Sequence, residues 1–122
     1  MRHNRFPLAV PYQRTGEVVL ANCLHPFEDP SSTGKVRPMI LDHRAGSQWM
    51  AMGLTTKPAY RNGQPRTPIP NPAALGLTGP GYLWGPRLTR ISALDLYYHL
   101  GWATEEVLAL IKHLQGLGGD AR

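Results

Sequence analysis

Two short segments of the sequence place phosphate-binding side chains at the ends of expected strands. The first is 35–38, where Arg37 stands at the junction between a loop and an aliphatic run. Pro38 restricts the backbone of Arg37, so the guanidinium is held in place, and a positioned arginine binds phosphate through paired hydrogen bonds. The second segment, 55–57, ends another apolar run with two hydroxyls and an ammonium, which can receive phosphate oxygens. For each segment the residues alone leave an ordinary alternative open: a surface salt bridge for Arg37, and a solvated strand end for the second.

The rest of the chain offers few other reactive groups at an informative spacing. The histidines at 3, 25, 43, 99 and 113 have no metal-ligand spacing, and no glycine-rich phosphate loop precedes a helix. The carboxylates Glu28 and Asp29 lie in a proline-containing loop, where a solvated turn explains them better than an acid/base pair. We therefore expect neither a metal nor a cofactor.

The composition favours a polyanionic or acidic partner in a reducing compartment. Lys and Arg number 13 against 8 Asp and Glu, for a formal net charge of +5, and ten of the cations are arginines. Arginine makes forked contacts with phosphate, although plain solubility would also explain such a surface. The single cysteine, Cys23, permits no internal disulfide, and neither a signal peptide nor a membrane span is evident. These features predict a cytoplasmic protein.

The elements that must carry these side chains are short strands followed by one helix. Apolar, β-branched runs predict strands over 18–24, 36–41 and 47–54, and later strand signals fall at 81–84 and 87–91. Residues 92–101 are ambiguous between an alternating strand and a helical turn. Thr104 is a good N-cap for a helix over 104–114, with glutamates in the first turn and Gly116 to stop it.

The order of these elements predicts a single mainly β domain. We expect an N-terminal arm at 1–15, a domain at 16–118 and a tail at 119–122. About five short strands and a C-terminal helix favour a small, mostly antiparallel barrel with the helix packed on it.

Taken together, these segments resemble the PemK/MazF family, the toxin endoribonucleases of bacterial toxin–antitoxin pairs. The run 16–20, Gly-Glu-Val-Val-Leu, is similar to the family's opening strand, and Arg37-Pro38 before an aliphatic strand resembles its most recognisable motif. Residues 54–57 resemble the family's strand-end Thr/Ser motif, 87–91 its late strand and 104–114 its terminal helix. The resemblance covers roughly residues 16–115.

The resemblance implies an SH3-like antiparallel barrel that works as a homodimer and cuts single-stranded RNA without a metal. In such chemistry the RNA 2′-hydroxyl attacks its own phosphodiester and leaves a 2′,3′-cyclic phosphate and a 5′-hydroxyl. The family's catalytic Arg and Thr map onto Arg37, for proton transfer and charge stabilisation, and Thr55, which assists. The same reading assigns RNA-binding roles to Lys35, Thr56, Lys57, His25 and Arg87. It also implies a cognate antitoxin whose acidic tail covers the RNA groove, and no membrane.

The sequence also departs from the family's pattern in ways that keep other functions open. The PemK branch uses a late-strand carboxylate as base, whereas residues 82–87 contain no Asp or Glu. The loop 25–35 lacks the family's Gly-x-Glu-Gln pattern, and Trp49, Tyr60, Trp84 and Trp102 can stack bases only if exposed. The alternatives are a catalytically silent PemK-like barrel that binds nucleic acid or protein, and another basic barrel that disables a host factor by binding.

Overall fold

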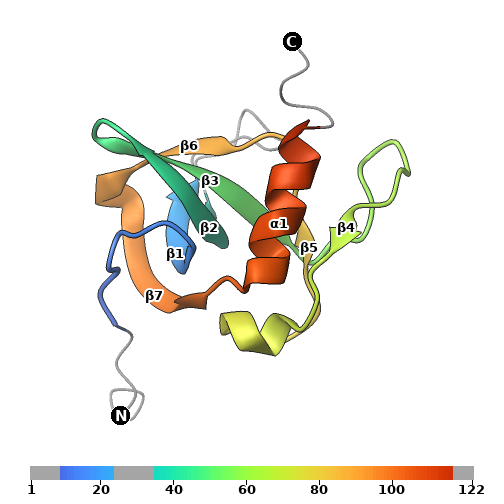
Figure 1. Cartoon of the computed structure of the whole chain (residues 1–122), viewed down its shortest axis with the longest axis horizontal. Helices are drawn as coiled ribbons and strands as arrows, with labels where there is room; N and C mark the ends of the chain where they lie inside the picture. Colours follow the sequence, from blue (N-terminus) through green and yellow to red (C-terminus); the bar gives the residue numbers. More distant parts are fainter. Residues whose placement is uncertain (1–8, 24–34, 117–122) are drawn as a thin grey trace.

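The chain folds as an antiparallel sheet with one helix laid across it (Figure 1). The computed structural model describes residues 9–23 and 35–116. In chain order its elements are β1 (Glu17–Cys23), β2 (Lys35–Ala45), β3 (Gln48–Thr55), β4 (Thr67–Pro68), η2 (Pro72–Leu75), β5 (Tyr82–Leu83), β6 (Thr89–Ser92), η3 (Ala93–Asp95), β7 (Leu96–Trp102) and α1 (Glu105–Leu114). The mainly β class with a C-terminal helix, predicted from the sequence, is confirmed.

Strand β3 pairs with two different strands along one of its edges, and the candidate site lies at the end of β3 that pairs with β5. The strand order is β4-β5-β3-β2-β1-β7, and β6 also pairs with β3. The first half of β3 pairs with β6, from Gln48 to Ala51, while its last two residues pair with β5. Among the described residues no ladder pairs β7 with β4 or with β6, so the sheet does not close into a barrel. The chain passes from β6 to β7 through η3.

Two apolar clusters lie on opposite faces of the central strands because side chains alternate along them. One face carries Val18, Ile40 and Met52, which pack with Val107 and Ile111 of α1. The other face carries a second buried cluster: Val19, Ala21, Met39, Leu41, Trp49, Ala51 and Ile91. Burial on both faces fixes the register of β1, β2 and β3, because a slip of one residue would exchange the two clusters.

Helix α1 forms where the sequence predicted it. The Thr104 side chain accepts a hydrogen bond from the Val107 backbone N–H at 3.2 Å, which caps the first turn. Glu105 and Glu106 lie in that turn, while Lys112 and His113 lie in the last one, so both ends complement the helix dipole. No helix in the described part of the chain is long and apolar enough to cross a membrane.

The structure corrects two of the strand predictions and resolves the one ambiguous segment. Strand β2 continues past its predicted end at residue 41 to Ala45, because its ladder with β3 runs on to that residue and the chain reverses at Gly46, whose φ is +66°. The ambiguous segment 92–101 contains both candidates, η3 and then β7, because β7 gains a ladder with β1. The described chain has seven strands rather than about five, and two of them are only two residues long.

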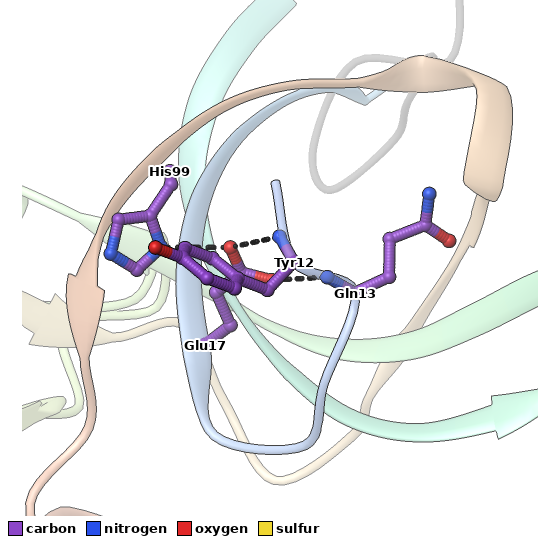
Figure 2. Close-up of polar contacts among 4 residues, drawn as sticks. All are labelled: Tyr12, Gln13, Glu17 and His99. Carbon is purple, nitrogen blue, oxygen red and sulfur yellow. Dashed lines mark hydrogen bonds and ion pairs between the residues drawn. The ribbon is translucent and has the colours of Figure 1, made fainter. Parts of the chain in front are cut away.

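The visible part of the N-terminal arm is fastened to the sheet by a buried carboxylate (Figure 2). Glu17 is 0% exposed, and its two carboxylate oxygens accept the backbone N–H groups of Tyr12 and Gln13 at 2.8 and 2.7 Å. The Nδ1 atom of His99 lies 2.8 Å from the same carboxylate. The Tyr12 ring packs on His99, and it also contacts Trp102 of β7. Three hydrogen-bonding groups therefore compensate the burial of Glu17.

Candidate anion-binding pocket

The pairing of β2 with β3 brings Arg37 and Thr55 together. The ladder pairs Met39 with Gly53. Arg37 lies two residues before Met39, and Thr55 lies two residues after Gly53, so the same register places the two residues opposite one another. Because side chains alternate, both are on the face that carries Met39, away from α1. The two segments that the sequence singled out therefore meet at one end of the sheet.

Residues 55–57 form a short turn in which a hydroxyl holds the backbone. The Thr55 Oγ1 atom accepts a hydrogen bond from the Lys57 N–H at 3.1 Å. A hydroxyl that accepts one bond still has a proton to donate, so Thr55 can also donate to an incoming oxygen atom. Thr56 and Lys57 are exposed beyond the strand end. This turn presents hydroxyl donors and an ammonium beside Arg37.

Arg37 and this turn line an open pocket of about 560 Å³. Its other walls are largely apolar, and its described lining contains two cations but no Asp, Glu or His. The full lining is Arg37, Pro38, Leu54, Thr55, Thr56, Lys57, Pro58, Leu77, Thr78, Gly79, Pro80, Gly81, Tyr82 and Trp84. Cations among low-dielectric walls favour an anionic ligand with an apolar or aromatic part.

An indole forms part of the pocket wall beside Arg37. The Trp84 backbone N–H donates to the Gly53 carbonyl at 2.8 Å, which seats Trp84 on the opposite edge of β3 from β2. The Arg37 Cζ atom lies 5.4 Å from the Trp84 ring centroid, within the range of a cation–π contact. Arg37 is half-buried and reaches across β3 toward this ring.

Behind the pocket lies a second arginine, which the sequence analysis did not identify. Arg66 is only 8% exposed. Its Nε donates to the Trp84 carbonyl at 2.9 Å, and its Nη1 donates to the carbonyls of Lys57 and Ala59 at 3.2 and 2.6 Å. Its Cζ lies 4.3 Å from the Trp84 ring centroid and 4.7 Å from that of Tyr60. No local sequence signal marks such a residue, because its partners are backbone carbonyls and distant rings.

The remaining predicted RNA-binding residues are not all at this pocket. Lys35 begins β2 opposite Cys23, but its side chain lies outside the described part of the structure, as does the whole of His25. Arg87 is exposed and lines a separate groove of about 700 Å³, together with His43 and Lys112. Of the predicted residues, the structure thus brings together Arg37, Thr55, Thr56 and Lys57.

The four aromatic side chains considered for base stacking differ in accessibility. Trp49 is 3% exposed within the second apolar cluster, and Tyr60 packs on Arg66. Trp102 is exposed but lies with the N-terminal arm. Trp84 is the one of the four that lines the pocket. In the described part of the chain, no group of three or more His, Cys, Asp or Glu side chains is placed to hold a metal ion.

Comparison with known proteins assigns no family to this chain. No family model matches the sequence, and no curated protein matches it. The resemblance to the PemK/MazF family therefore depends on the motifs quoted above, and the site must be argued from its own geometry.

Proposed function

We propose that this protein is a toxin endoribonuclease that cleaves single-stranded RNA at the pocket formed by Arg37, Thr55, Thr56 and Lys57. The observation that carries the proposal is that two separate segments, each predicted from the sequence to bind phosphate, converge on one pocket whose described lining bears only positive charges. The largely apolar walls, with Trp84 among them, suit the base of a nucleotide whose phosphate contacts the cations.

The proposed reaction is an in-line transfer within the RNA. The ribose 2′-oxygen bonds to the adjacent phosphorus as the bond from phosphorus to the 5′-oxygen breaks. The 2′-hydroxyl loses its proton to water and the departing 5′-oxygen gains one, so the products are a 2′,3′-cyclic phosphate and a 5′-hydroxyl. The planar guanidinium of Arg37 has a fork of N–H donors, which suits it to stabilising the extra negative charge on the phosphoryl oxygens. The Thr55 hydroxyl would donate a further hydrogen bond.

The same reading extends to the fold and the partners. The sheet order and the η3 connection from β6 to β7 are compatible with a partly open SH3-like barrel. We infer a cytoplasmic homodimer and a cognate antitoxin with an acidic tail, which the net charge of +5 would attract. Such a tail would compete with RNA for Arg37.

Cleavage of a mixed-sequence single-stranded RNA in EDTA tests the proposal. We expect the wild-type protein and an Arg90→Ala control, changed at an exposed position on β6, to cut the RNA. The Arg37→Ala variant should not. Failure of the folded, antitoxin-free wild-type protein to cut any of a diverse set of RNAs would refute the proposed endoribonuclease activity.

One observation favours a second function, in which the pocket binds nucleic acid without cutting it. The described lining of the pocket offers no carboxylate or imidazole to accept the 2′ proton. In the same assay this alternative predicts that RNA binds in an Arg37-dependent manner while its length distribution stays unchanged.

A further inference from the structure

Arg66 is buried beside the pocket yet lines none of it. Burying a cation is costly unless hydrogen bonds compensate it, and here the compensation comes from three backbone carbonyls and two aromatic rings. A buried arginine with this set of partners joins the parts of the chain that supply them.

The partners of Arg66 belong to two segments that are distant in sequence. Lys57 and Ala59 follow β3, while Trp84 follows β5. The segment 58–66 closes as a hairpin, since the Tyr60 N–H donates to Gln64 and the Arg66 N–H donates to Pro58, each at 2.8 Å. The Arg66 side chain then folds back and bonds both the start of this hairpin and the Trp84 carbonyl.

Both segments supply walls of the pocket. Lys57 and Pro58 form one part of the lining and Trp84 another, and Arg66 bonds the backbone of Lys57 and of Trp84 directly. Lysine in place of Arg66 would keep the charge but could not span three carbonyls with a planar fork or stack in the same way.

We propose that Arg66 is a positioning residue that sets the Trp84 indole and the Lys57 turn at the separation the pocket needs to bind nucleotides. The nucleotide part of this inference rests on the proposed function, whereas the positioning part does not. Arg66 need not touch the ligand. It acts through Trp84 and Lys57, and its loss lets the two walls move independently.

The positioning is tested by ¹⁹F NMR on protein labelled with 5-fluorotryptophan. A Trp84→Phe variant assigns the Trp84 resonance, and the other two signals come from Trp49 and Trp102. We expect Arg66→Lys to shift or broaden the Trp84 resonance while the other two stay in place. The matched Arg90→Lys change, on exposed β6, should move none of them. An unmoved Trp84 resonance in folded Arg66→Lys protein would overturn the inference.

A second variant covers the case in which Arg66→Lys does not fold. Tyr60→Leu removes one of the two rings that stack on Arg66 and leaves its three carbonyl partners in place. It should move the Trp84 resonance in the same direction by a smaller amount. A fixed resonance in this variant would count against the inference in the same way.

Binding of a fluorescein-labelled 2′-O-methyl RNA, which cannot react through its 2′-oxygen, tests the consequence for the ligand. We expect Arg66→Lys to raise Kd about 10- to 100-fold, the usual loss when a group that orients binding residues is removed. Arg90→Lys should leave Kd unchanged. If the wild-type protein binds this RNA and folded Arg66→Lys binds it equally well, the positioning role is overturned. If the wild-type protein does not bind it, the proposed function fails and the ¹⁹F result alone decides the role of Arg66.

Discussion

The pocket depends on a few side chains whose contributions differ in kind. Arg37 supplies a charge that is half-buried beside an indole, where electrostatic stabilisation is stronger than in water. Thr55 supplies a neutral hydroxyl that is already engaged with the Lys57 N–H. Removing the charged donor should therefore lower the activity of the protein by more than removing the neutral donor.

For Arg37→Ala we expect the cleavage rate at saturating RNA to fall about 10²- to 10³-fold, as when a donor to a developing oxyanion is removed. Arg37→Lys keeps the charge but loses the forked geometry, so it should recover only part of the rate. Single-turnover cleavage measures both variants. Equal rates for wild type and Arg37→Ala would show that Arg37 does not contribute to cleavage.

Replacing Thr55 with Val should lower the same rate by about fivefold, because one neutral hydrogen bond contributes about 1 kcal/mol. Thr55→Ser retains the hydroxyl and should stay close to wild type. The comparison separates the hydroxyl from the bulk of the side chain. A Ser variant as slow as the Val variant would show that the shape of the side chain matters and its oxygen does not.

At the scale of the elements, strand pairing sets the geometry of the pocket. The sequence predicted some of these elements and contacts but not all of them. Strands β1, β2 and β3 and helix α1 were predictable, since β-branched runs and the Thr104 cap are local signals. The meeting of Arg37 with Thr55 depends on the Met39–Gly53 register, which follows from burial on both faces. Neither the role of Arg66 nor the place of loop 77–81 in the pocket wall could be predicted, because their contacts join segments distant in sequence.

Glu17 fastens the arm to the sheet, so Glu17→Gln should lower the free energy of unfolding by about 1–3 kcal/mol. A carboxamide cannot accept with both atoms, and one of the two backbone N–H groups would lose its acceptor. Glu106→Gln, exposed on α1, is the matched control and should change stability by about 0.5 kcal/mol or less. Urea denaturation measures both. A Glu17→Gln variant as stable as the control would contradict this account of the arm.

The contact between η2 and β7 leaves no room for a side chain on either glycine there. A Cβ on Gly101 would lie 2.5 Å from the Leu75 carbonyl oxygen, and one on Gly76 would clash with the Leu100 carbonyl oxygen. We expect Gly101→Ala to destabilise the protein by about 1–3 kcal/mol, as in other overpacked sites. Gly79→Ala, where a Cβ meets no atom within 4 Å, is the control, and thermal unfolding compares the two. Equal melting temperatures would show that η2 does not pack closely on β7.

At the scale of the whole molecule, positive charge is distributed over more than one groove. Arg37 and Lys57 line the pocket, and Arg87 and Lys112 line the second groove. Charge patterning and net charge were readable from the sequence, whereas the separation of Arg87 from Arg37 appears only in the fold. An RNA that follows both grooves would contact several phosphates and release counterions from each.

Binding of 2′-O-methyl RNA should accordingly weaken with salt. The plot of log affinity against log salt concentration should fall by about 0.7 for each phosphate neutralised. Arg87→Gln should make this slope shallower by about 0.7, and Arg90→Gln should not change it. Titrations by fluorescence anisotropy at several salt concentrations measure the slopes. An unchanged slope in Arg87→Gln would show that the bound RNA does not contact Arg87.

The most direct test of the central claim is the chemistry of the cut ends. An RNA oligonucleotide is incubated with the protein in EDTA, beside the same oligonucleotide with a single 2′-deoxy substitution at the cleaved nucleotide, and the products are identified by mass spectrometry. We predict a 2′,3′-cyclic phosphate and a 5′-hydroxyl from the first, and no cut at that position in the second. Cleavage of the 2′-deoxy site, or products with a 5′-phosphate, would contradict attack by the 2′-hydroxyl.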